Sequence, residues 1–210
     1  MTETGRLVLH WSPRSPYVRL VTVAAAECGL TDRIKQVRTL VGTYRDIPDG
    51  YDDHPLGKIP TLVLPDGRRL YDSRVITEWM AGSTGTRLYP STFDERIETL
   101  RRQALGIGII DLMVLGLAER LKGRDAPASE LYAATAPKLA RGLAGLALET
   151  EALARTAFDA GHIAIAGALA YADFRFPDFD WRSGHPDLSG WAETAWARPS
   201  MRDTVFVDDS

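Results

Sequence analysis

The sequence from Leu7 to Arg19 reads LVLHWSPRSPYVR. Its first five residues, Leu7 to Trp11, form a short apolar run that is typical of a buried strand. Pro16 suits the first position of a helix, because the N–H that proline lacks would have no partner there. Ser15 precedes it, and a serine hydroxyl can cap the free N–H groups of a helix start. The stretch therefore predicts a strand, a tight connection, and a helix whose positive end attracts an anion such as a thiolate.

The first third of the chain continues to alternate between strand and helix patterns. The predicted elements are a helix over 16–28, strands over 34–37, 61–64 and 69–71, and a helix that begins at 72–73. Residues 39–57 are polar and predict a long irregular segment, and Pro65-Asp66-Gly67 predicts a hairpin turn. A βαβ unit followed by a hairpin predicts a mixed four-stranded sheet.

The rest of the chain carries no strand pattern. Residues 83–90 have the composition of a linker, and apolar residues then recur at helical spacing over 92–122, 129–157, 163–174 and 187–197. A loop is expected over 177–184. Gly106 and Gly108 lie within the first of these helical runs, where glycine indicates that another segment packs closely. The sequence thus predicts an all-helical second domain.

Composition narrows the class of protein. The 210 residues carry a formal net charge of −3 and a single cysteine, Cys28. This mild acidity gives no reason to expect a nucleic-acid or membrane partner, and no stretch approaches the roughly 20 apolar residues of a membrane span. Residues 1–6 lack the apolar core of a signal peptide, so we expect a cytoplasmic protein. The four histidines have no metal-ligand spacing, and no CxxC is present, so we expect no metal cofactor and no protein-based dithiol exchange.

Four motifs in this order resemble the bacterial glutathione S-transferases over essentially the whole chain. They are SPRSPYVR (12–19), LGKIPTLV (56–63), LYDSRVI (70–76), and YADFRFPD (171–178) with RPS (198–200). The resemblance implies a thioredoxin-like domain over 1–82 that binds glutathione as co-substrate, a linker over 83–90, and an all-helical domain over 91–210. In this family the helical domain supplies most of the pocket for the second substrate, and most members are homodimers.

The resemblance makes Ser15 the first choice for the catalytic hydroxyl, with Ser12 as the alternative. A mostly ionised glutathione thiol at neutral pH needs a pKa lowered by about two units, which corresponds to ~2.7 kcal/mol. A helix N-terminus contributes ~0.3–1 kcal/mol, and a hydrogen bond to a charged acceptor ~1.5–3 kcal/mol. Together these suffice, so a hydroxyl at the start of the helix is the expected device. Arg14 is a further candidate to line the site.

Two later motifs are expected to hold the rest of glutathione. The resemblance implies that the Ile59–Pro60 bond is cis and that the backbone of Ile59 pairs with the cysteinyl backbone of the tripeptide. It also implies that Ser73 donates to the γ-glutamyl carboxylate while Asp72 accepts from its ammonium group. Helix capping alone is the competing explanation for this pair. Either His54 or Lys58 is expected to contact the glycyl carboxylate.

The sequence departs from its relatives in the second half. Many relatives begin the central helix with Ser or Thr, two apolar residues and Asp, which is a capping box. The matching stretch here is 164–167, AIAG, so both box residues are expected to be absent, and His162 is the remaining candidate for a cap. Ile107 stands where relatives tend to have Asp, which favours an apolar second pocket. The aromatic side chains between Tyr171 and Trp181 are interpreted as core and cover.

Serine-type glutathione transfer to an apolar electrophile is the function that these residues favour. Isomerisation, dehalogenation or ether cleavage, and disulfide reduction use the same thiolate and stay open. The competing class is a glutathione-binding or partner-binding protein without turnover.

Overall fold

The computed structural model describes residues 5–42, 51–120 and 130–209. The chain divides into two compact units. Unit 1 comprises residues 1–91 and returns with 200–210, and unit 2 comprises residues 92–199. The chain thus leaves unit 1 once, forms unit 2, and comes back. The central part of the irregular segment predicted over 39–57 lies outside the described residues.

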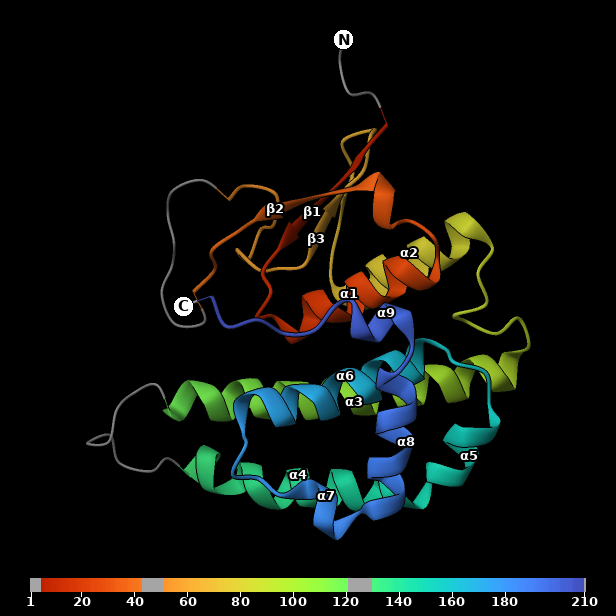
Figure 1. Ribbon diagram of the computed structural model, residues 1–210. Helices are drawn as coiled ribbons and strands as arrows, with labels where there is room; N and C mark the ends of the chain where they lie inside the picture. Colours follow the sequence, from red (N-terminus) through yellow and green to blue (C-terminus); the bar gives the residue numbers. More distant parts are fainter. Residues whose placement is uncertain (1–4, 43–50, 121–129, 210) are drawn as a thin grey trace. The chain divides into compact units, whose positions relative to one another are not determined.

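Unit 1 is built on a mixed four-stranded sheet, as the order of elements predicts (Figure 1). Its strands are β1 (Leu7–Trp11), β2 (Ile34–Arg38), β3 (Thr61–Val63) and β4 (Arg69–Leu70), in the order β2-β1-β3-β4. Strand β1 pairs in parallel with β2 and antiparallel with β3, and β3 pairs antiparallel with β4. Leu7 and Leu9 of β1 are fully buried and Val8 between them is not, because successive side chains of a strand point to opposite faces.

Helices α1 (Pro16–Glu27) and α2 (Ser73–Thr84) belong to the same unit, with the short 3-10 turn η1 (Thr31–Arg33) after α1. Each helix begins with a side-chain cap, supplied by Ser15 and Asp72. Helix α2 ends where Gly85 adopts a left-handed conformation with φ 74°, which glycine accepts without steric cost. Together with the sheet, these helices bury the core side chains of unit 1, which include Leu7, Leu9, Leu62, Ile76 and Met80.

The last described segment completes unit 1. It begins with α9 (Pro199–Arg202) and continues without regular structure to residue 209. Arg19 of α1 donates a hydrogen bond from Nη2 to the carbonyl of Met201 at 3.1 Å, and its guanidinium stacks on the ring of Phe206 at 4.6 Å. Arg19 is only 7% exposed, and burial lowers the pKa of its guanidinium to about 10. The partners of this charged side chain of the first helix therefore come from chain far away in the sequence.

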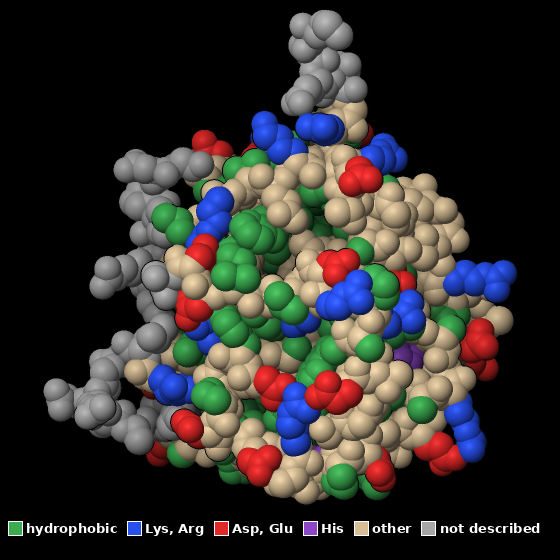
Figure 2. All heavy atoms as spheres, in the orientation of Figure 1, with side chains coloured by type: hydrophobic (Ala, Val, Ile, Leu, Met, Phe, Trp, Pro, Cys, Tyr) green, Lys and Arg blue, Asp and Glu red, His purple; other side chains and the backbone are tan. Residues whose placement is uncertain are grey.

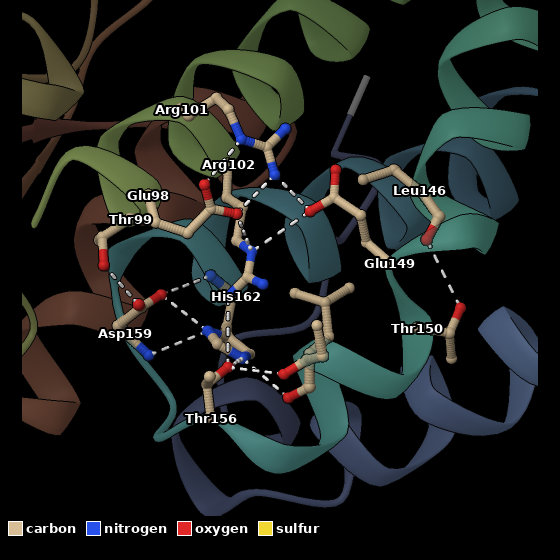
Figure 3. Close-up of polar contacts among 12 residues, drawn as sticks. Glu98, Thr99, Arg101, Arg102, Leu146, Glu149, Thr150, Thr156, Asp159 and His162 are labelled. Atoms are coloured by element: carbon tan, nitrogen blue, oxygen red, sulfur yellow. Dashed lines mark hydrogen bonds and ion pairs between the residues drawn. The ribbon is translucent and has the colours of Figure 1, made fainter. Parts of the chain in front are cut away.

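All regular secondary structure among the described residues of unit 2 is helical. Its helices are α3 (Phe93–Arg120), α4 (Glu130–Leu148), α5 (Thr150–Arg155), α6 (Ala160–Arg175), α7 (Trp181–Gly184) and α8 (Pro186–Trp196). The single helix predicted over 129–157 is wrong, because α4 and α5 are separate. The carboxylate of Glu149 lies at the break, paired with Arg101 and Arg102 of α3 (Figure 3). The loop predicted over 177–184 contains the short helix α7, which Asp180 caps.

The expected absence of a capping box on the central helix is also wrong. Helix α6 begins at Ala160, and its N-cap is Asp159 (Figure 3). Asp159 Oδ1 accepts a hydrogen bond from the backbone N–H of His162 at 3.0 Å, and His162 Nδ1 lies 3.4 Å from the backbone nitrogen of Asp159. The box exists, but with Asp at its first position and His at its fourth, five residues before the stretch that the family resemblance indicates.

Two further hydrogen bonds connect this buried capping box to the neighbouring helices. The Thr99 hydroxyl donates to Asp159 Oδ2 at 2.6 Å, and His162 Nε2 donates to the carbonyl of Leu153 at 3.0 Å. Asp159 is 6% exposed. Burial by itself would raise the pKa of its carboxyl group, but the hydrogen bonds from His162 and Thr99 outweigh it and hold the pKa below the usual range. The box therefore ties α3, α5 and α6 together.

Glycine permits a close approach of α3 and α6, as the sequence indicates for one residue of the pair. A Cβ on Gly106 would lie 2.6 Å from the carbonyl carbon of Ala164 and 2.8 Å from its oxygen. A Cβ on Gly108 would meet no atom within 4 Å. Gly161 at the start of α6 is constrained in the same way, since its Cβ would lie 2.7 Å from the Cβ of Arg102. The two helices approach so closely because glycine occupies these contact positions.

We predict that Gly106→Ala destabilises the protein by about 1–3 kcal/mol, because overpacking against the Ala164 backbone outweighs the gain in helix propensity. Urea denaturation measures the change. Gly108→Ala in the same helix is the matched control, and it is expected to be neutral or stabilising by up to ~1 kcal/mol. Equal stability of the two variants would contradict the close approach.

We predict that Asp159→Ala lowers the free energy of unfolding by about 2 kcal/mol or more, since it removes the N-cap of α6 and leaves the Thr99 hydroxyl without its acceptor. The folded-state pKa of Asp159 is depressed, so its contribution is full above the unfolded-state pKa near 3.9 and is lost as pH falls through the lower folded value. Stability measured from pH 7 to pH 2 tests this.

Asp180→Ala is the comparison variant, because Asp180 caps the four-residue helix α7 from an exposed position. It should lose far less stability than Asp159→Ala. A loss of similar size in both variants would show that the buried contacts of Asp159 contribute nothing beyond capping.

Candidate functional site

Strand directions bring four chain segments of unit 1 to one edge of the sheet, here called the site edge. Strand β1 ends there with Trp11. Because β3 is antiparallel to β1, Thr61 at the start of β3 lies opposite His10 near that end. Strand β4 runs back antiparallel to β3 and ends at the same edge, immediately before the start of α2. Strand β2 is parallel to β1, and its last residue pairs with Trp11. The site edge therefore collects the start of α1, the Ile59–Pro60 segment and the start of α2.

The two candidate serines differ in their surroundings. Ser15 is partly exposed, and its Oγ accepts one hydrogen bond, from the backbone N–H of Val18 at 3.3 Å. Among the described residues, no acceptor is found for the proton of this hydroxyl. Ser12 is buried at 7% exposure, and its Oγ lies 3.4 Å from the backbone N–H of Arg14. The Ser15 hydroxyl can therefore still act as a hydrogen-bond donor at the start of α1.

The Ile59–Pro60 peptide bond is cis, as the resemblance implies. Both residues are buried, and the loop before them is anchored by a tyrosine that the sequence interpretation did not single out. The Tyr51 hydroxyl lies 2.8 Å from the Lys58 carbonyl oxygen and 2.6 Å from Thr61 Oγ1. Burial raises the pKa of Tyr51 to about 12, so its hydroxyl stays neutral and can donate.

A second set of missed residues holds this loop against the sheet. His10 of β1 contacts Thr39 Oγ1 through Nδ1 and Asp53 Oδ2 through Nε2, both at 2.8 Å. Asp53 Oδ1 also accepts from Arg69 Nε at 2.6 Å. Burial alone would raise the pKa of Asp53, but the hydrogen bonds from Arg69 and His10 lower it overall. The contacts join residues up to 43 positions apart, so no local pattern in the sequence indicates them.

The start of α2 combines a cap with an ionised carboxylate. Asp72 Oδ1 accepts from the backbone N–H of Arg74 at 3.0 Å, and Oδ2 is paired with the guanidinium of the same residue at 3.1 Å. Burial would raise the pKa of Asp72, but these hydrogen bonds from Arg74 outweigh it and lower the pKa. Ser73 is buried at the first helical position. Asp72 therefore caps α2, and its carboxylate remains charged at neutral pH.

The remaining candidates differ in how available they are. His54 is buried, and its Nδ1 accepts from the backbone N–H of Leu56 at 2.9 Å, so the ring carries its proton on Nε2. Burial and the nearby charge of Lys58 lower the pKa of His54, which keeps the ring neutral at pH 7. Lys58 is exposed. Arg14 is half-buried and paired with Asp209 at 2.9 Å.

A hollow of about 320 Å³ in unit 2 is lined in part by three aromatic residues, Phe176, Phe179 and Trp181. Trp181 is buried, and its Nε1 donates to Asp173 at 2.8 Å. Ile107 is also buried in unit 2.

The described residues contain no group of His, Cys, Asp and Glu that is arranged to hold a metal ion. Within the same residues no helix has the length and apolar character needed to cross a membrane. On the face drawn in Figure 2, basic and acidic side chains are interspersed.

Comparison with known proteins assigns this architecture to a family. The family model of the glutathione S-transferase N-terminal domain matches residues 14–82, and that of the C-terminal domain matches residues 129–194. A thioredoxin-like sheet unit followed by a helical unit is the fold that these models describe. The chain belongs to the glutathione S-transferase family.

Individual relatives agree with this assignment. A glutathione transferase family member from Pseudomonas fluorescens Pf-5, crystallised with bound glutathione, is 37% identical with a TM-score of 0.89, and the match covers 95% of this chain and 98% of that one. A glutathione S-transferase from Methylobacillus flagellatus KT with glutathione bound is 32% identical with a TM-score of 0.86, covering 96% and 100%. The GST-like protein YibF of Escherichia coli K12 is 25% identical, covering 90% of this chain and 94% of YibF.

Proposed function

We propose that this protein is a glutathione S-transferase that activates the glutathione thiol at Ser15 and transfers the thiolate to an electrophilic small molecule with an apolar body. The observation that carries the proposal is the Ser15 hydroxyl, which caps α1 from a partly exposed position and whose proton has no acceptor within the part of the chain that the structure describes. Ser12 is the second choice, because its side chain is buried. A hydrogen bond of ~1.5–3 kcal/mol and a helix N-terminus of ~0.3–1 kcal/mol together match the ~2.7 kcal/mol needed.

The rest of glutathione is assigned to the other segments of the site edge. The backbone of Ile59, before Pro60, pairs with the cysteinyl residue as an added strand would. Ser73 and the first N–H groups of α2 receive the γ-glutamyl carboxylate, and the ionised Asp72 accepts from the ammonium group. Lys58 is the exposed cation for the glycyl carboxylate, with His54 contributing a neutral N–H and Arg14 lining the site.

Related crystal structures support conjugation as the reaction. The Pseudomonas fluorescens Pf-5 family member was also crystallised with S-(propanoic acid)-glutathione, an adduct whose sulfur carries a carbon substituent. Isomerisation, dehalogenation, ether cleavage and disulfide reduction begin from the same thiolate, so they remain alternatives within the same site. A cytoplasmic homodimer that serves detoxification belongs to this proposal as well.

We predict that Ser15→Ala lowers kcat/KM for 1-chloro-2,4-dinitrobenzene roughly 10- to 100-fold, because the thiolate loses a hydrogen bond worth about 1.5–3 kcal/mol. The pKa of the bound thiol should rise by one to two units, about the same free energy, so the pH–rate profile moves to higher pH. Initial rates between pH 6 and 9 measure both effects.

Ser12→Ala is the matched control, and it should leave the pH–rate profile in place. The opposite result would transfer the catalytic role to Ser12. Retention on immobilised glutathione without turnover, unchanged by Ser15→Ala, would instead favour a glutathione-binding protein. An absence of glutathione binding at millimolar concentration would remove the proposed function altogether.

We predict that Ser73→Ala raises the Kd for glutathione about tenfold, since a hydrogen bond to a carboxylate is worth about 1.5 kcal/mol. Titration calorimetry measures the change. Ser83→Ala, near the other end of α2, is the control and should leave the Kd unchanged. An unchanged Kd in Ser73→Ala would reduce the start of α2 to a purely structural cap.

A further inference from the structure

Two arginine side chains at the site edge hold one carboxylate of the chain itself. Arg14 Nε lies 2.9 Å from Asp209 Oδ1. Arg38 contacts Asp209 Oδ2 through Nε and Nη2, both at 2.8 Å. Each carboxylate oxygen is thus contacted by a different guanidinium. Forked N–H donors of this kind recognise planar carboxylates with more geometric selectivity than lysine does.

The position of this pair is fixed by the sheet and by α1. Arg38 is the last residue of β2 and pairs with Trp11, so it lies at the site edge. Arg14 lies in the connection between β1 and α1 and immediately precedes Ser15, the proposed thiolate partner. Arg14, which contacts the Asp209 carboxylate, is therefore the sequence neighbour of the proposed thiolate partner.

The chain holds Asp209 in this position only loosely. It follows residues 203–208, which have no helix or strand, and a backbone hydrogen bond runs from Val207 N–H to the Pro13 carbonyl at 3.3 Å. The side chains of Arg14, Arg38 and Asp209 are 31–32% exposed. Ion pairs with this much solvent contact contribute at most about 1 kcal/mol each. An external carboxylate can therefore replace Asp209 at small cost.

We infer that Arg14 and Arg38 form a receptor for the carboxylate of an acidic electrophile, and that Asp209 occupies this receptor until such a substrate binds. The inference rests on the proposed function, because it assigns one end of the second substrate. The substrate class is an apolar compound that carries one carboxylate, separated from its reacting carbon by a spacer such as a benzene ring. In the reaction with an aryl chloride, the carbon–sulfur bond forms, the carbon–chlorine bond breaks, chloride leaves, and the thiol proton goes to solvent. The carboxylate is unchanged and no redox step occurs.

The test compares 4-chloro-3-nitrobenzoate with its neutral isostere 4-chloro-3-nitrobenzamide. Asp209→Asn should lower the KM for the benzoate about three- to fivefold and leave the KM for the benzamide unchanged, because it removes the internal competitor. Arg38→Gln should raise the KM for the benzoate by a similar factor. The double variant Arg38→Gln/Asp209→Asn should keep this raised KM. Asp203→Asn, an exposed acidic residue of the same segment, and Lys35→Gln, an exposed cation of the same strand, are the matched controls.

Calorimetry with the two S-aryl glutathione products gives a readout that is independent of turnover. Tighter binding of the acidic product in Asp209→Asn, without turnover of either electrophile, would support the receptor and remove the transferase function. If the protein turns over the benzamide and none of the variants changes the ratio of the KM values for the benzoate and the benzamide, the receptor is overturned and the proposed function stands. A weaker Kd for glutathione in Arg38→Gln, with the acid preference unchanged, would assign the arginine to the glycyl carboxylate and also overturn the inference.

Discussion

The pairing of β1 with a parallel neighbour on one side and an antiparallel neighbour on the other determines the site of this protein. The parallel partner requires the α1 crossover, whose start then lies where β1 ends. The antiparallel partner begins at that same edge, so the cis Ile59–Pro60 segment lies next to it. The hairpin from β3 to β4 returns the chain there once more and begins α2. A sheet of short strands thus gathers two helix N-termini and the buried cis Ile59–Pro60 segment at one edge.

Unit 2 depends on a different kind of constraint, which is close contact between helices. Gly106 lets α3 approach the backbone of α6, and the Asp159–His162 box fixes where α6 begins. Both features are buried, and both involve residues from separate helices. Thr99 of α3 donates to the cap of α6, so the packing of the two helices and the capping of one of them stabilise each other. Losing either feature is therefore expected to lower the stability of the whole unit.

The sequence predicted the sheet, its mixed topology and the helix starts at Pro16 and Ser73, because strand periodicity, proline position and capping residues are local patterns. It missed the cap of α6, since Asp159 and His162 occupy the box with residue types that differ from those of the relatives. It also missed the break between α4 and α5, because the residue at the break is Glu149 and not a glycine or proline that would mark the end of a helix. Glu149 instead forms ion pairs with arginines of α3. The Tyr51 and His10 contacts and the Arg14–Arg38–Asp209 cluster join residues remote in the sequence. Such pairings follow from the fold and have no local signature. The roles proposed for Ser15, Ile59 and Ser73 toward glutathione come from the family resemblance, with their placement at the site edge as support.

The return of residues 200–210 to unit 1 has a consequence for modularity. Arg19 lies within α1, and the described partners of its buried guanidinium, the Met201 carbonyl and the Phe206 ring, come from that returning segment. A fragment that stops at residue 91 contains every strand of the sheet, but it lacks the Met201 carbonyl and the Phe206 ring that contact the Arg19 guanidinium. The first and second halves of the chain are therefore not independent folding modules. Any chimera that exchanges the helical half with that of a relative has to leave the final ten or so residues with their own first helix.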